Sequence, residues 1–236
     1  MNLRRFIGKC LAGWYIIRSK IHPSFSQAGE DQVIKWLLHQ LKISDPTYLD
    51  IGANHPIIGN NTYYFYSRGN KGVCIEPDPY FTSLLKKHRS RDKILNVGIT
   101  HDHRTKGELF IFPYPYSGWN TFSEQEAYSR QAETGIQVKE KVTIPMKSIN
   151  QILKDNFEKC PNLISIDVEG MDLQILQSLD FVTYKPEVIC VETITFSTKN
   201  EENNIPEIEI LLKSKGYFPY ANTHINTIFC LADAYN

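Results

Sequence analysis

Apolar runs alternate with amphipathic stretches along most of the chain. Runs with the character of buried strands occur at 47–52, 71–76, 93–99, 162–168 and 186–192. Stretches with helical spacing of apolar residues occur at 31–41 and near 60–68, 79–88, 148–156, 170–180 and 205–215. Strands that alternate with helices predict an α/β domain, a mostly parallel sheet with helices on both faces. Two late runs, 217–220 and 227–231, predict an antiparallel pair at the edge of that sheet.

A longer excursion, residues 100–145, interrupts this alternation between the third and fourth strands. Runs at 108–112 and 141–144 predict two extra strands, and 113–122 is rich in proline, glycine and aromatic residues. Long loops inside compact domains are commonly functional. We expect the excursion to form part of a substrate wall or lid; the alternative is a surface loop held by its own aromatic side chains.

The first twenty-five residues have a different character from the rest. Apolar residues recur there at helical spacing, and the charged residues among 1–20 are all arginine or lysine. The pattern predicts a basic amphipathic helix over 1–25, followed by one domain over 26–236. Such a helix can lie on an anionic membrane surface, or pack on the domain or on a second subunit of a homo-oligomer. No stretch is long and apolar enough to span a bilayer.

Charge and cysteine content exclude several classes of protein. Twenty-six acidic residues balance twenty-six basic ones, which argues against nucleic acid as the main partner. The five cysteines include no Cys-x-x-Cys pair. We therefore expect a reducing compartment, with neither a disulfide framework nor a zinc site. This places the protein in the cytoplasm, with peripheral contact to the inner face of the membrane through 1–20 as an option.

The ends of the first two strands carry candidate ligand-binding residues. Gly52 ends the first strand where the chain must turn and let a ligand approach its backbone, and Glu76 ends the second, where an acid can accept both ribose hydroxyls. A dinucleotide fingerprint would need further glycines in register, whereas Pro56 stands where its helix would begin. A nucleoside without a pyrophosphate fits better. Alternatively, Asp50 and Glu76 only cap strands and helices of an ordinary α/β domain.

Acids also follow the fourth and fifth predicted strands. Asp167 and Glu169 come after one, and Glu192 ends the next, so all three should face the same crevice as Gly52 and Glu76. Neighbouring carboxylates raise one another's pKa, which suits a general base, or they can hold Mg²⁺. The sequence leaves both roles open. His224, in the turn between the last two strands, is either a further base or a surface residue.

Six stretches resemble, in their order and spacing along the chain, the FkbM family of S-adenosylmethionine-dependent methyltransferases. They are Ser26-Gln-Ala-Gly-Glu-Asp31, Tyr48-Leu-Asp-Ile-Gly-Ala-Asn-His-Pro56, Asn61-Thr-Tyr-Tyr-Phe-Tyr66 with Arg68-Gly69, Ile75-Glu-Pro-Asp-Pro79, Ser165-Ile-Asp-Val-Glu-Gly-Met-Asp172 and Asn226-Thr-Ile-Phe229. The resemblance implies a class I methyltransferase fold, which is a Rossmann-like, seven-stranded, mostly parallel sheet with an antiparallel last strand.

The resemblance also implies S-adenosylmethionine as cofactor and assigns site residues by position. The cofactor-binding set is Asp50, Gly52, Ala53, Asn54, Thr62, Glu76, Pro77, Asn96, Val97, Gly98 and Asp167. It places Asp167 and Glu169 at the catalytic mouth. With Glu192 and His224, which are candidates from their positions in the predicted sheet, the catalytic set is Asp167, Glu169, Glu192 and His224, and the three acids would also hold any metal ion. We expect an O-methyltransferase acting on a hydroxyl of a carbohydrate, a surface glycan or its precursor. The alternative is a non-catalytic binding module with the same fold in a glycan-assembly complex.

Overall fold

The computed structural model of the protein describes residues 23–102, 104–168, 170–194 and 203–235. The helix expected over 1–25 therefore lies outside the described residues, except for its last three positions. Within the described ranges, no helix combines the length and the apolar character that crossing a bilayer requires.

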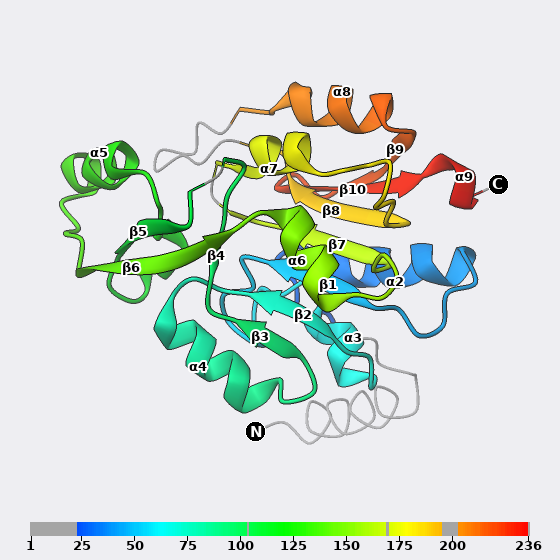
Figure 1. The fold of residues 1–236 in the computed structure, drawn as a ribbon, viewed down its shortest axis with the longest axis horizontal. Helices are drawn as coiled ribbons and strands as arrows, with labels where there is room; N and C mark the ends of the chain where they lie inside the picture. The colour runs from blue at the N-terminus through cyan, green and yellow to red at the C-terminus, as the bar shows by residue number, and fades with distance from the viewer. Residues whose placement is uncertain (1–22, 103, 169, 195–202, 236) are drawn as a thin grey trace, which may run out of the picture.

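The main sheet has seven strands in the order β3-β2-β1-β7-β8-β10-β9 (Figure 1). Its neighbours are parallel except at β10, which runs antiparallel to both β8 and β9. The predicted mostly parallel sheet with an antiparallel last strand is thus confirmed. Chain order reverses between β1 and β7, where the carboxyl ends of parallel strands leave a crevice. The strands are β1 (Tyr48–Ile51), β2 (Gly72–Ile75), β3 (Lys93–Leu95), β7 (Leu163–Ile166), β8 (Val188–Glu192), β9 (Tyr217–Asn222) and β10 (Asn226–Leu231).

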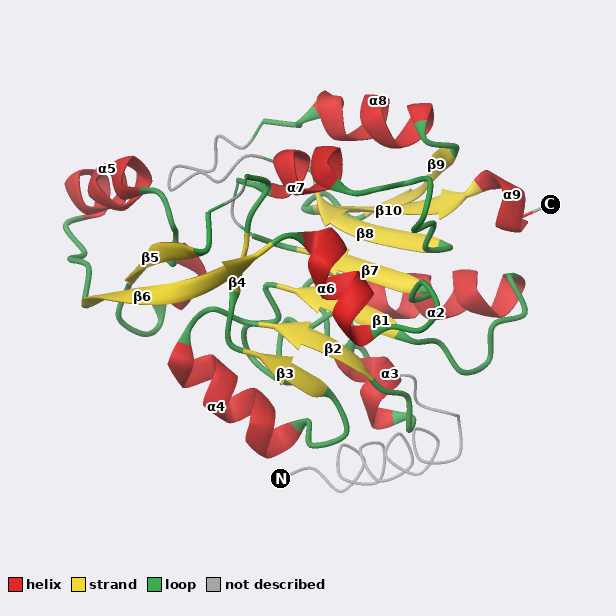
Figure 2. Ribbon diagram, viewed as in Figure 1, coloured by secondary structure: helices red, strands yellow, loops and turns green. Residues whose placement is uncertain are grey.

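Helices cover both faces of this sheet (Figure 2). Successive strand residues point to opposite faces, so Tyr48 joins one apolar cluster and Leu49 joins the other. The cluster around Leu49 includes α6 (Ile149–Asn156), α7 (Asp172–Ser178) and α8 (Pro206–Ser214). The cluster around Tyr48 includes α2 (Glu30–Gln40), α3 (Tyr63–Ser67) and Leu85 of α4 (Pro79–His88). A short α9 (Ala232–Tyr235) follows β10.

The excursion folds into a second, three-stranded sheet of order β4-β6-β5. It comprises β4 (Gly98–Ile99), β5 (Lys106–Ile111), the 3₁₀ turn η1 (Tyr116–Trp119), α5 (Glu124–Thr134) and β6 (Glu140–Lys147). The single strand predicted over 93–99 is wrong, because the chain leaves the main sheet after Leu95 and pairs Gly98 with Met146 instead. The two extra strands predicted at 108–112 and 141–144 are present and longer than expected, whereas α5 was not predicted.

Two glycines hold the second sheet in its position. A Cβ atom at Gly98 would lie 2.6 Å from Cζ of Phe122, and one at Gly107 would lie 3.1 Å from Cδ1 of the same ring. The sulfur of Met146 crowds both positions as well. Phe122 and Met146 therefore pack closely over both glycines, and a larger residue at Gly98 would displace them.

Gly52, at the end of β1, is packed against the chain itself. Its φ is +81°, and an added Cβ atom would overlap the backbone carbonyl oxygen of Asp167. The amide of Asp167 in turn donates to the carbonyl oxygen of Ile51 at 3.0 Å. The sequence suggested that this glycine makes room for a ligand; the structure shows that it first makes room for the loop after β7.

Replacing Gly52 by alanine should destabilise the protein. The steric overlap with a backbone atom and the left-handed φ together predict a loss of about 2 kcal/mol or more in the free energy of unfolding. Urea unfolding followed by circular dichroism measures it. Gly118→Ala is the matched control, since no atom lies within 4 Å of its added Cβ; equal stability of the two variants would contradict this account.

Candidate active site

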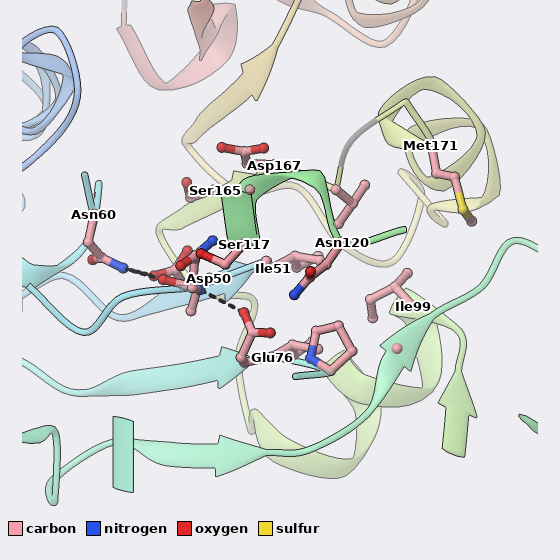
Figure 3. A pocket seen from close by; sticks show the side chains of 18 of the residues that line it. Asp50, Ile51, Asn60, Glu76, Ile99, Ser117, Asn120, Ser165, Asp167 and Met171 are labelled. Atoms are coloured by element: carbon pink, nitrogen blue, oxygen red, sulfur yellow. Dashed lines mark hydrogen bonds between the residues drawn. The ribbon is translucent and has the colours of Figure 1, made fainter. Parts of the chain in front are cut away.

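A pocket of about 270 Å³ lies at the carboxyl ends of β1, β2 and β7, beside the point where the strand order reverses. Figure 3 shows Asp50 and Glu76 on neighbouring strand ends, with Asp167 across the pocket from Glu76. The lining comes mainly from five parts of the chain: the segment before α2, the loop after β1, the loop after β2, the loop after β7, and the second sheet.

Glu76 is held rigidly at the end of β2. Its Oε2 accepts the amide N–H of Asn54 at 2.7 Å, and its Oε1 accepts the amide N–H of Asp78 at 2.7 Å. Asn54 has a φ of +47°, the left-handed conformation that asparagine tolerates. Burial raises the pKa of Glu76 to about 8, although the two N–H donors oppose the shift, and the nearby acids Asp78 and Asp50 add to it. The carboxyl group is fixed in place while part of it still lines the pocket.

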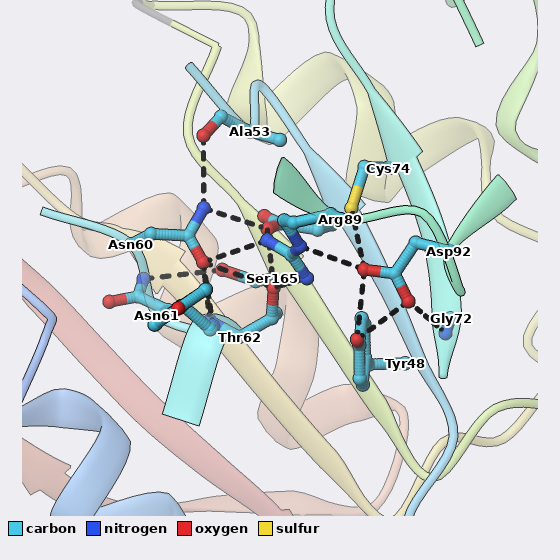
Figure 4. A network of polar contacts seen from close by, with 12 residues as sticks. Tyr48, Ala53, Asn60, Asn61, Thr62, Gly72, Cys74, Arg89, Asp92 and Ser165 are labelled. Carbon is cyan, nitrogen blue, oxygen red and sulfur yellow. Dashed lines mark hydrogen bonds and ion pairs between the residues drawn. The ribbon is translucent and has the colours of Figure 1, made fainter. Parts of the chain in front are cut away.

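Asp50, one strand away, is anchored by the buried Arg89. Figure 4 shows the polar network around that arginine. Its Oδ2 accepts the Thr62 hydroxyl at 2.6 Å and the Asn60 side-chain amide at 3.2 Å, and lies 3.5 Å from Nη1 of Arg89. Burial raises the pKa of Asp50, while Arg89 and these hydrogen bonds act in the opposite direction.

Arg89 is fully buried and has a partner at each end of its guanidinium group. Its Nε donates to Oδ2 of Asp92 at 2.7 Å, Nη1 to Oδ1 of Asn60 at 3.1 Å, and Nη2 to the Thr62 hydroxyl at 2.8 Å. Asp92 also accepts the Tyr48 hydroxyl at 2.8 Å. A buried cation is stable only when its donors are satisfied in this way, so the network fixes the loop after β1 relative to the end of α4.

Asp167 lines the pocket, and the buried Asp172 lies behind it in the first turn of α7. Burial raises the pKa of Asp167 to about 6, with further contributions from the charges of Asp50 and Glu30. Burial likewise raises the pKa of Asp172 to about 7, and Asp167 is the charge that adds to it. Oδ1 of Asp172 accepts the Val168 amide N–H at 3.3 Å, which shapes the loop that carries Asp167.

A strap formed by residues 24–31 crosses the pocket on the side of the β1 loop. At one end, the carbonyl oxygen of Phe25 accepts the amide N–H of Asn60 at 2.9 Å. At the other end, Oε1 of the buried Glu30 accepts the Thr223 hydroxyl at 2.7 Å and the Asn226 side-chain amide at 3.1 Å. The strap therefore connects the loop after β1 with the turn between β9 and β10.

The second sheet contributes the remaining wall of the pocket. Ser117, Asn120 and Phe122 line it, and the side-chain amide of Asn120 donates to Oδ2 of Asp78 at 2.9 Å. Because the amide of Asp78 is also hydrogen-bonded to Glu76, the excursion is connected through one residue to the acid at the end of β2.

Nine of the predicted site residues lie in the pocket lining. They are Asp50, Gly52, Ala53, Asn54, Glu76, Pro77, Val97, Gly98 and Asp167. Strand order brings them together, since the loops after β1, β2, β3 and β7 all emerge at one edge of the sheet.

Two predicted cofactor ligands lie just behind this lining. Thr62 is hydrogen-bonded to Asp50, and Asn96 donates to the carbonyl oxygens of Glu76 at 2.9 Å and Pro77 at 2.8 Å. Both therefore hold pocket residues in place and do not line the pocket themselves.

Two of the predicted catalytic residues, Glu192 and His224, are not brought into the pocket. Glu192 ends β8 opposite Asn226, and neither it nor His224 lines the pocket. His224 is exposed in the β9–β10 turn and has a φ of +79°. Glu169 lies outside the described residues. The general-base role of Glu169 stays a prediction.

The structure does not decide the metal hypothesis. In the described part of the chain, no three His, Cys, Asp or Glu side chains gather in an arrangement that could hold a metal ion. One of the three proposed ligands, Glu169, is not among those residues, and a second, Glu192, does not line the pocket with Asp167. A carboxylate metal site therefore stays a prediction.

Sequence reasoning missed several residues that build the site. Arg89 follows three basic residues at the end of α4 and has the pattern of a solvated helix end, so nothing in the sequence marks it as buried. Gln27 lies in a stretch that matched the family pattern but received no role. Asn60 follows a strand end and precedes a helix, a position where a polar cap could have been expected.

Comparison with known proteins agrees with this geometry. The chain matches the Methyltransferase FkbM domain over residues 50–219, well over half of its length. No curated protein matches it. Among solved structures, a putative O-methyltransferase from Klebsiella pneumoniae aligns with a TM-score of 0.46 and 9% identity over 94% of this chain and 96% of that chain. An O-methyltransferase from Bacillus cereus aligns with a TM-score of 0.44 and 10% identity over 88% and 82%.

These structural similarities are low, so the assignment rests on the family match. The observed strand order, with an antiparallel strand inserted next to the edge, is that of the class I methyltransferase fold. The chain belongs to the FkbM family of methyltransferase domains.

Proposed function

We propose that the protein transfers a methyl group from S-adenosylmethionine to a hydroxyl group of a carbohydrate, such as a surface glycan or its precursor. The observation that carries the proposal is the position of Glu76. Its carboxyl group is held by two backbone N–H groups beside the Gly52 turn, in a pocket that also contains Asp167.

Different parts of the pocket suit the ribose, the adenine and the amino-acid end of that cofactor. Glu76 can accept the two ribose hydroxyls, as an acid at this strand end does in nucleoside-binding α/β proteins. Val97, Ile99 and Phe122 supply an apolar surface on the second-sheet side, which suits adenine, and Met171 before α7 adds to the apolar lining. The amino-acid end would then lie towards Gly52. The cofactor supplies an electrophilic methyl group on a sulfonium ion.

The charge of the pocket favours a cationic ligand. Asp167, which is mostly ionised at neutral pH, lines it together with Asp50, while its lining among the described residues contains no lysine, arginine or histidine. A sulfonium ion is stabilised by such surroundings, as is the positive charge of its α-amino group. Methyl transfer itself needs little more than in-line positioning of the acceptor oxygen.

Asp167 is the residue that we assign as general base. With a pKa of about 6 it is mostly ionised at neutral pH and still basic enough to accept the proton of a hydroxyl group. Its amide donates to the carbonyl oxygen of Ile51, and its own carbonyl oxygen packs closely against Gly52, which fixes the backbone that carries this carboxylate. The carbohydrate acceptor rests on the family resemblance.

The assay for this proposal uses S-adenosylmethionine labelled in the methyl group and an extract of glycan precursors. Label recovered in a methyl ether of a sugar supports the proposal. Label transferred only to a protein, a lipid amine or a nucleic acid would contradict the acceptor class, and no transfer at all would favour a non-catalytic binding module.

Affinity for the nucleoside should rise with pH through the pKa of Glu76. Below about pH 8 the free carboxyl group is mostly protonated, and the ionised form accepts ribose hydroxyls more strongly, so binding favours ionisation and releases a proton. Methylthioadenosine suits the titration, because it has no group that ionises between about pH 7 and pH 9. Calorimetry in two buffers of different ionisation enthalpy measures the released proton.

Glu76→Gln tests the origin of that pH dependence. We expect it to bind methylthioadenosine about tenfold more weakly, or weaker still, with no change across the same pH range. Glu209→Gln, an exposed exchange on α8, is the matched control and should behave as the unmodified protein. A variant at Glu76 that keeps both the affinity and its pH dependence would rule out the ribose-binding role.

Replacing Asp167 by asparagine should lower the rate of methyl transfer by about 10²–10⁴-fold, the usual contribution of a general base. In the unmodified protein the rate should rise as pH increases through about 6, because only the ionised carboxylate accepts a proton. The residual rate of the variant should lack this rise. Asp155→Asn, at an exposed position on α6, is the control; full activity of Asp167→Asn would exclude the base.

A further inference from the structure

Gln27, in the middle of the strap, has a side chain without a partner at the pocket. Gln27 and Asn54 both line the pocket, and neither side chain makes a hydrogen bond with any residue that the structure describes. Gln27 lies beside Gly59, whose added Cβ atom would be 3.6 Å from its Cγ. The two free carboxamides thus belong to the end of the pocket next to the β1 loop.

The other polar groups at this end are already occupied. The side-chain amide of Asn60 donates to Asp50 and to the carbonyl oxygen of Ala53 at 2.9 Å, and that of Asn61 donates to the Ser165 hydroxyl at 3.2 Å. The nearest cation to Asp50, Arg89, is buried and hydrogen-bonded on all sides.

A ligand carboxylate at this end would therefore meet acids and no cation. The ligand carboxylate would lie near Asp50 and Asp167. Within the described ranges, the pocket lining has no positively charged side chain that could pair with it. Neutral N–H donors are the remaining way to hold such a group. The carboxamide of Gln27 is a free donor in the required place.

We propose that Gln27 donates a hydrogen bond to the α-carboxylate of the cofactor, with Asn54 as its counterpart across the pocket, so that the strap is a cofactor-binding element. The inference rests on the proposed function, since it assumes an amino-acid end on the bound nucleoside. It concerns a segment that lies before the matched residues 50–219.

The strap is built to fix Gln27 in position. Oδ2 of Asp31 accepts the Phe25 amide N–H at 2.7 Å, and its Oδ1 accepts the Ser24 hydroxyl at 2.7 Å. Oε2 of Glu30 accepts the Ala28 amide N–H at 2.8 Å. Burial acts to raise the pKa of Glu30, but the hydrogen bonds from the Thr223 hydroxyl and the Ala28 amide lower it. Gln27 lies between these two anchors on a backbone that is already ordered.

The proposal is tested by measuring the affinities of two ligands by calorimetry, one with the amino-acid end and one without it. S-adenosylhomocysteine carries the α-carboxylate, and methylthioadenosine shares the nucleoside but lacks that group. Gln27→Ala should weaken S-adenosylhomocysteine about tenfold or more, the value of a hydrogen bond to a charged group, and change methylthioadenosine by less than about twofold. Gln27→Glu should weaken S-adenosylhomocysteine further, since it places two carboxylates together, again without affecting methylthioadenosine.

Gln137→Ala, an exposed glutamine in the second sheet region, is the matched control and should leave both affinities unchanged. Equal affinities of Gln27→Ala and the unmodified protein for S-adenosylhomocysteine would overturn the inference, as would an equal loss for both ligands. If the unmodified protein binds neither ligand, the proposed function fails instead, so the two failures are distinguishable.

Discussion

The buried guanidinium group of Arg89 is the interaction on which the site depends. It joins Asp50 at the end of β1 to Asp92 before β3, and it holds Asn60 and Thr62 between them. Two carboxylates this deeply buried would be unstable as anions without that cation. The rings of Tyr48 and Tyr66 also lie 5.5 Å and 5.4 Å from its guanidinium carbon, which excludes water from the network. The position of the loop after β1, and with it the shape of the pocket, follows from this one side chain.

The features that the sequence allowed us to predict are those that depend on short stretches. The apolar runs of β1, β2, β7 and β8 are buried on both faces, so their composition alone identified them. Because parallel strands present their carboxyl ends at one edge, Gly52, Glu76 and Asp167 could be placed together without any knowledge of the fold's details.

What could not be predicted depends on contacts between distant parts of the chain. The strand expected over 93–99 is divided because Asn96 is hydrogen-bonded to the end of β2 and Gly98 pairs with β6, and neither partner is near in sequence. Helix α5 has few apolar residues, and its buried side chains are only Ala127 and Arg130, so its pattern resembles a polar loop. Glu192 ends a strand as expected, yet β10 inserts beside it and occupies the neighbouring position.

The close packing of Phe122 over Gly98 and Gly107 has a consequence for how relatives of this protein can diverge. Phe122 lines the pocket and at the same time holds the second sheet in register, while Asn120 connects that sheet to Asp78. Exchanging residues 100–145 between family members would therefore exchange part of the pocket wall together with any selectivity for acceptors. Chimeras that aim to alter only the acceptor would have to leave both glycines and Phe122 untouched and vary the tips of the excursion.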